Sequence, residues 1–115
     1  MAPFIDPDTE QIDACIAAGT RIVELHTGRY AEARADGVRA RELERVRQAA
    51  RHAARLGVEV HAGHGLNYHN VQPVAAIPEI IELNIGHAIV AQAVFDGLAR
   101  AVGDMKRLML AARGA

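Results

Sequence analysis

The chain has 115 residues, half of them apolar, and its 13 basic and 14 acidic side chains give a formal net charge of −1. This length and apolar content suffice for one compact domain over residues 1–115, while the balanced charge argues against sequence-independent nucleic-acid binding and leaves a small anionic ligand possible. The single cysteine cannot form an internal disulfide and no signal-peptide pattern opens the chain, so we expect a cytoplasmic protein. No apolar run approaches the roughly 20 residues that span a bilayer, so we do not expect membrane insertion.

The first elements predicted are a short strand over residues 3–6 and a helix that starts in the sequence Asp-Pro-Asp. Either Asp6 caps this helix with Pro7 in its first position, or Asp8 caps it with Gln11 as its capping-box partner. Apolar residues at helical spacing and a terminating glycine follow: Ile12, Cys15, Ile16 and Gly19.

Residues 21–27 predict a second strand, which is closed by Gly28. A polar stretch then leads into a long helix that ends at about Leu56, before Gly57. We expect its buried stripe to comprise Leu43, Val46, Ala50, Ala53 and Leu56. Two ion pairs at i,i+3 spacing are expected on its solvated side, Glu42 with Arg45 and Glu44 with Arg47.

Residues 58–62 predict a third strand, and the loop Gly63-His64-Gly65 follows it directly. A short helix capped by Asn70 and a break at Pro78 lead to a fourth strand over residues 80–85. A helical region then opens at Gly86-His87 and runs to the end of the chain. Its buried face is expected to comprise Val94, Leu98, Val102, Met105 and Met109.

The regular alternation of strands and helices predicts an α/β fold with parallel strands and right-handed crossovers. Three strands are apolar on one face and carry a carboxylate with a histidine or asparagine on the other: Glu24 with His26, Glu59 with His61, and Glu82 with Asn84. A doubly wound sheet has two apolar faces, whereas the inward faces of a (β/α)8 barrel meet near an axis where such enzymes do chemistry. A sheet whose polar face simply meets water is the alternative. Four strands would form half of a barrel, which another copy or another polypeptide would complete.

The ends of these strands hold the candidate functional residues. His64 follows a strand directly and could donate or accept a proton, although a structural loop histidine is the competing interpretation. Gly86-His87 begins a helix, where backbone N–H groups favour a phosphate. Glu24 would need a partner such as His26 or a ligand cation, and a structural ion pair is the alternative. A metal site is another possible use of three histidines, although their spacing fits no common zinc signature: His61, His64 and His69.

Four stretches carry a family resemblance: Val-Glu-Leu-His-Thr-Gly at 23–28, Val-His-Ala-Gly-His-Gly-Leu-Asn-Tyr-His-Asn at 60–70, Glu-Leu-Asn-Ile-Gly-His-Ala-Ile at 82–89, and Met-Lys-Arg-Leu-Met-Leu-Ala-Ala-Arg-Gly at 105–114. With them, the sequence resembles the pyridoxine 5'-phosphate synthase family from Phe4 to Gly114. The resemblance implies a (β/α)8 TIM-barrel enzyme of vitamin B6 biosynthesis, a transferase that forms a homo-oligomer in the cytoplasm. It condenses 1-deoxy-D-xylulose 5-phosphate with 3-amino-2-oxopropyl phosphate and uses no metal or organic cofactor.

The resemblance also implies a role for five residues. His64 matches the family's proton donor, and Glu24 matches the carboxylate that stabilises the transition state. The residues that match the aminoketone-phosphate site are Gly65, Gly86 and His87. The matching stretches are those of strands 5–8, the C-terminal half of the family's barrel, so the other catalytic histidine and glutamate have no counterpart here. We therefore expect little or no synthase activity from this chain alone. The alternative is a non-catalytic half-barrel that self-assembles or pairs with a complementary half.

Overall fold

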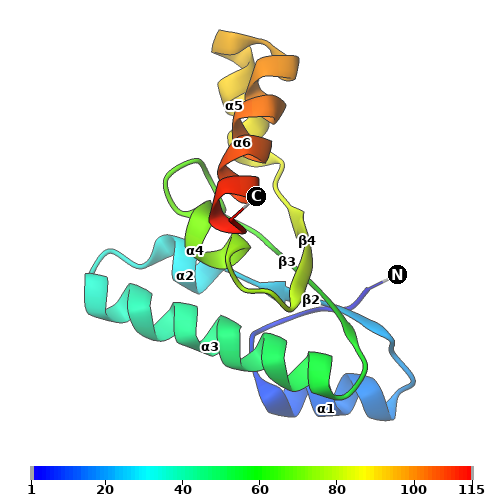
Figure 1. Cartoon of the computed structure of the whole chain (residues 1–115). Helices are drawn as coiled ribbons and strands as arrows, with labels where there is room; N and C mark the ends of the chain where they lie inside the picture. Colours follow the sequence, from blue (N-terminus) through cyan, green and yellow to red (C-terminus); the bar gives the residue numbers. More distant parts are fainter. Residues whose placement is uncertain (1, 115) are drawn as a thin grey trace.

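Four parallel strands form the centre of the protein in the computed structural model, which describes residues 2–114 (Figure 1). The strands are β1 (Phe4–Ile5), β2 (Ile22–His26), β3 (Glu59–Gly63) and β4 (Ile80–Asn84). Their order in the sheet is β1-β2-β3-β4, so each strand pairs with the next one along the chain. All four predicted strands are confirmed.

The helices of the described residues are α1 (Thr9–Ala17), α2 (Gly28–Glu32), α3 (Asp36–Arg55), α4 (Val71–Ala75), α5 (His87–Asp96) and α6 (Leu98–Ala112). Sequence patterns did not predict α2, which is a single short turn of helix after β2. The helical region predicted after β4 is divided in two at Gly97, whose φ of +83° lies in the left-handed region that glycine adopts without strain. No helix in residues 2–114 is long and apolar enough to cross a membrane.

The start of α1 agrees with the second of the two predicted caps. Asp8 is the N-cap, and its Oδ1 accepts a hydrogen bond from the backbone N–H of Glu10 at 2.9 Å. Gln11 does not complete a capping box with Asp8, because its Oε1 accepts from the backbone N–H of Asp6 instead. Asn70 is the N-cap residue of α4, as predicted, but its side chain forms no cap hydrogen bond.

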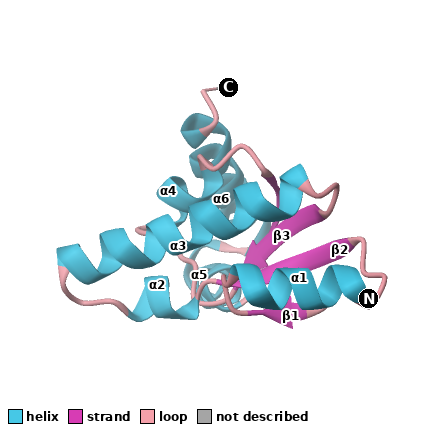
Figure 2. Ribbon diagram, turned by 90° about the horizontal axis from the view of Figure 1, so that it is seen from below, coloured by secondary structure: helices cyan, strands magenta, loops and turns pink. Residues whose placement is uncertain are grey.

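The core lies between the sheet and the helices that cover one of its faces. Figure 2 shows α1 and α3 side by side over this face. The fully buried side chains of β2 and β3 point into the core: Val23, Leu25, Val60 and Ala62. They meet the predicted stripe of α3, whose buried members are Val46, Ala50 and Ala53, with Leu43 packed against them. Both predicted ion pairs form on the solvated side, Arg45 with Glu42 at 2.9 Å and Arg47 with Glu44.

Leu56 does not belong to the buried stripe of α3. It is 51% exposed, because it is the C-cap residue, where the chain leaves the helix and turns at Gly57. The helical spacing that predicted its burial no longer applies beyond the last helical residue.

The buried face predicted for the last helical region is also largely wrong. Of its five residues only Met105 is buried and Met109 is partly buried, while Val94 is 79% exposed. The chain reverses at Gly97, so α5 and α6 pack mainly against each other and project from the sheet (Figure 1). Side chains near this reversal, including Val94 and Leu98, have no neighbouring layer to cover them.

Candidate ligand site at the carboxyl end of the sheet

A pocket of about 320 Å³ lies where the strands end and the loops after β3 and β4 begin. Its lining comprises Phe4, Glu24, His64, Gly65, Leu66, Asn84, Ile85, Gly86 and His87. All five residues singled out from the sequence therefore border the same space, although they come from three segments of the chain. Functional groups of parallel α/β proteins gather at this end of the sheet.

The backbone of His64 has a conformation that few non-glycine residues adopt. Its φ is +94°, the only positive φ of a non-glycine residue in the described part of the chain. The buried hydroxyl of Thr27 donates a hydrogen bond to the carbonyl oxygen of His64 at 2.8 Å. Gly65 follows with a φ of +77°, and a Cβ there would lie 2.7 Å from the Cβ of Ala31. These contacts fix the direction in which the imidazole of His64 leaves the chain.

The ring of His64 stacks against a second histidine. Its centroid lies 4.5 Å from that of His26, with 32° between the ring planes, and His26 in turn contacts Phe4 at 4.6 Å. The Nδ1 atom of His26 accepts a hydrogen bond from the backbone N–H of Gly28 at 3.0 Å. Since Nδ1 is an acceptor, the proton of the neutral His26 ring is on Nε2.

The rings of His26 and His64 fit together because Gly28 has no side chain. A Cβ at this position would lie 2.3 Å from Cε1 of His26 and 3.1 Å from Cδ2 of His64. Its φ is not in the left-handed region, so space and not backbone conformation explains the glycine.

Glu24 has a different partner from the one expected. Its Oε1 accepts a hydrogen bond from Nδ2 of Asn84 at 3.0 Å, and His26 is occupied by Gly28. No Lys, Arg or His within residues 2–114 forms an ion pair with the Glu24 carboxylate. The carboxylate is therefore oriented by a neutral amide, and no cationic side chain of the described residues is paired with it.

The start of α5 forms another part of the pocket wall. Gly86 is the N-cap of this helix, and no side chain forms a hydrogen bond to cap it. The first N–H groups of a helix have no partner within it and carry partial positive charge. His87 is the first helical residue and its side chain is exposed at the pocket. This wall can hold an anion.

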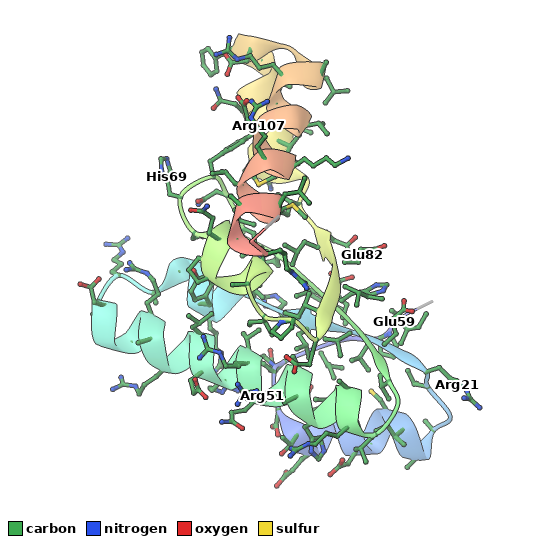
Figure 3. The ribbon with its side chains drawn as sticks, in the orientation of Figure 1. Arg21, Arg51, Glu59, His69, Glu82 and Arg107 are labelled. Atoms are coloured by element: carbon green, nitrogen blue, oxygen red, sulfur yellow. The ribbon has the colours of Figure 1, made fainter. Side chains whose placement is uncertain are left out.

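A second group of charged side chains lies on the same face of the sheet but outside the pocket. Nε2 of His61 lies 2.7 Å from Glu59, and its Nδ1 lies 3.2 Å from Glu82. Figure 3 shows Glu59 and Glu82 on the side of the sheet away from α3. Among the described residues, no three His, Cys, Asp or Glu side chains are arranged to hold a metal ion, so His61, His64 and His69 do not form a metal set.

A larger hollow of about 670 Å³ lies between the start of α1 and the charged side of α3. Two of its charged side chains, Glu42 and Arg45, form an ion pair with each other, and Glu44 pairs with Arg47. Hydrogen bonds from Gln48 and Arg47 lower the pKa of Glu44 below its usual value.

Comparison with known proteins identifies the family. Residues 1–111 match the model of the family described as "Pyridoxal phosphate biosynthesis protein PdxJ". The chain belongs to the PdxJ family. Two curated relatives, each named "Pyridoxine 5'-phosphate synthase", come from Pseudoalteromonas translucida and Photobacterium profundum. They are 59% and 57% identical over 110 residues, which are 96% of this chain and 45% of each relative. The chain thus spans less than half the length of these relatives, and the resemblance inferred from its motifs is confirmed.

Several residues that line or support this pocket were not predicted as part of it, Asn84, Phe4 and Thr27 among them. Asn84 had been placed on the polar face with Glu82, and its position next to Ile85-Gly86 could have indicated a role in the pocket. Phe4 and Thr27 gave no such signal, because one contributes a ring from a two-residue strand and the other a buried hydroxyl.

Proposed function

We propose that this chain carries the aminoketone-phosphate site and the proton donor of a pyridoxine 5'-phosphate synthase, an enzyme of vitamin B6 biosynthesis in the cytoplasm. The reaction is the condensation of 3-amino-2-oxopropyl phosphate with 1-deoxy-D-xylulose 5-phosphate. The observation that carries the proposal is that one pocket is bordered by all five matching residues: Glu24, His64, Gly65, Gly86 and His87. Membership of the PdxJ family supports it.

Two groups in the pocket lining suit the two charged groups of this substrate. The uncapped amides at the start of α5, with His87, favour a phosphate. The unpaired carboxylate of Glu24 favours a cation such as the substrate's ammonium group. A volume of about 320 Å³ is at the lower end of the range of small-ligand pockets, as expected for a three-carbon phosphate.

His64 is the proton donor in this proposal. Its ring borders the pocket, and its direction is fixed by the hydrogen bond from Thr27 and by stacking on His26. A protonated imidazole can give its proton to a departing hydroxyl oxygen, which then leaves as water. Glu24 would stabilise the positive charge that develops on the substrate during such a step. No metal or organic cofactor enters this chemistry.

The sheet supports a half-barrel as the architecture. Consecutive strands are neighbours, the helices α1 and α3 cover one face, and the other face carries Glu24, His61 and Glu82. Within residues 2–114 the outer edges of β1 and β4 have no partner strand. We therefore propose that the chain forms strands 5–8 of a (β/α)8 barrel and that a complementary half supplies the remaining catalytic residues. On this proposal the chain alone has little synthase activity, and the complete barrel forms homo-oligomers.

Calorimetric titration of the purified chain tests the proposed site. Inorganic phosphate and 3-amino-2-oxopropyl phosphate should both bind, and His87→Ala should weaken both by roughly tenfold, the loss expected for a hydrogen bond to a charged group. His69→Ala is the matched control, because His69 is an exposed loop histidine outside the pocket. Binding that is unchanged in His87→Ala would contradict the assignment.

A second candidate function is a non-catalytic half-barrel that assembles with a copy of itself. The observation in its favour is the unpaired edge of β4, where Ile81 is 63% exposed. If two copies closed one barrel, each would contribute the carboxylates of Glu24, Glu59 and Glu82, so six carboxylates would point toward one axis. Their mutual repulsion costs free energy unless they find partners. Sedimentation equilibrium separates the cases, since a concentration-independent monomer mass would exclude self-assembly.

A further inference from the structure

Glu24 and Asn84 form a hydrogen bond although their strands are not neighbours. Glu24 lies on β2, Asn84 lies on β4, and β3 runs between them. The strand register pairs Glu24 with His61, and it pairs Asn84 with Gly63. Strands two positions apart are separated by roughly 10 Å, so the two side chains must lean toward each other over β3 to reach 3.0 Å.

Gly63 provides the space in which they meet. A Cβ on this residue would lie 2.8 Å from the carbonyl oxygen of Asn84 and 2.9 Å from Oε2 of Glu24. Real Cβ atoms do not come this close to such neighbours, so any side chain at Gly63 would push the carboxylate or the strand away. The φ of Gly63 is not in the left-handed region, so the backbone does not itself require glycine.

The chemistry of the partner also matters. An amide donates a hydrogen bond to a carboxylate without neutralising it, whereas a lysine or arginine at the same place would cancel its charge. Oε1 of Glu24 is held by Asn84, and the carboxylate borders the pocket without an ion-pair partner among the described residues. This arrangement suits a carboxylate that has to recognise a cation of the ligand.

We infer that Asn84 is a positioning residue that aims the Glu24 carboxylate at the ligand's ammonium group, and that Gly63 is a glycine because this contact passes over it. The inference rests on the proposed function. It adds a structural reason why the pocket would select a ligand that carries an amine. The pair should make the pocket prefer 3-amino-2-oxopropyl phosphate over dihydroxyacetone phosphate, which has a hydroxyl group in place of the amine.

The ratio of the two dissociation constants, measured by calorimetry, tests this selectivity. The unmodified chain should bind the amine more tightly than the hydroxyl analogue. Asn84→Ala and Gly63→Ala should each lower this preference by roughly 3- to 10-fold, the range for one charge-assisted hydrogen bond, while the affinity for inorganic phosphate stays the same. The control is Glu59→Gln, which removes a carboxylate from the same face outside the pocket and should leave the ratio unchanged.

A loss of affinity that is equal for both ligands and for phosphate would mean that Asn84 has only a structural role, and it would overturn the inference. Equal binding of amine and hydroxyl by the unmodified chain would overturn it too, while leaving the proposed phosphate site standing.

A failure of phosphate to bind would contradict the proposed function. The contact between Asn84 and Glu24 can still be tested in that case, by a measurement that needs no ligand. In ¹H–¹⁵N spectra, the side-chain NH₂ signals of Asn84 should lie away from those of free asparagine. They should move in Glu24→Gln and in Gly63→Ala, and stay in place in Glu59→Gln. Signals at free-asparagine positions that do not respond to Glu24→Gln would overturn the inference.

Discussion

Replacing Gly28 with alanine would place a methyl group where two histidine rings meet. Its Cβ would lie 2.3 Å from Cε1 and 2.9 Å from Nδ1 of His26, and 3.1 Å from Cδ2 of His64. The His26 ring would have to rotate, and it would lose both its stacking and the hydrogen bond from the backbone N–H of residue 28. Overpacking costs about 1–3 kcal/mol and the hydrogen bond about 1 kcal/mol, so we expect a loss of about 2–4 kcal/mol in the free energy of unfolding.

Urea unfolding followed by circular dichroism measures this loss as a lower midpoint at an unchanged slope. Gly103→Ala is the matched control, because Gly103 lies inside α6 and a Cβ there meets nothing within 4 Å. That change should stabilise the chain by about 0.5–1 kcal/mol, the difference in helix propensity. In a His26→Ala background, Gly28→Ala should cost much less, because the ring that it displaces is gone. An equal cost in both backgrounds would refute the steric explanation.

Three further substitutions test other contacts around the site. Thr27→Val removes the buried hydroxyl that donates to His64, and should lower the free energy of unfolding by about 1–2 kcal/mol; no change would mean that this bond does not hold the loop. Gly65→Ala requires an unfavourable φ and a 2.7 Å contact with Ala31, so it should weaken phosphate binding measured by calorimetry. Unaltered affinity would contradict a role of this loop conformation in binding. Burial raises the pKa of Tyr30 above its usual value, against an opposing effect of Arg39. Tyr30 therefore ionises at lower pH in the unfolded chain, and the free energy of unfolding should fall as pH rises through about 10. Urea unfolding between about pH 9 and about pH 11 should show a smaller decline in Tyr30→Phe. An identical decline in the variant would mean that Tyr30 is not its cause.

The strands and the face of α3 could be predicted because their patterns report local geometry. The alternation along β2 and β3 separates Val23 and Val60 from Glu24 and His61, and the structure buries the first pair in the core. The buried face expected after β4 was wrong for a physical reason: helical spacing shows which side chains share a face, but not whether another element packs on it. The reversal at Gly97 leaves much of that face without a neighbour.

The meeting of the candidate residues at one pocket could be predicted, but their contacts could not. His64 follows β3 directly and His87 follows β4 after Ile85 and Gly86, so their meeting at one end of a parallel sheet follows from topology. The partner of Glu24 could not be predicted, because the contact with Asn84 joins strands that are not adjacent and depends on the missing side chain of Gly63. Sequence spacing contains no signal for a contact of that kind.

Backbone amide spectra recorded while the chain is titrated with 3-amino-2-oxopropyl phosphate test the proposed site most directly. We predict saturable shifts of Gly65, Gly86 and His87, with the remaining changes at their neighbours around the pocket. The absence of saturable shifts at these residues, or shifts confined to the hollow between α1 and α3, would contradict the assignment of this pocket as the aminoketone-phosphate site.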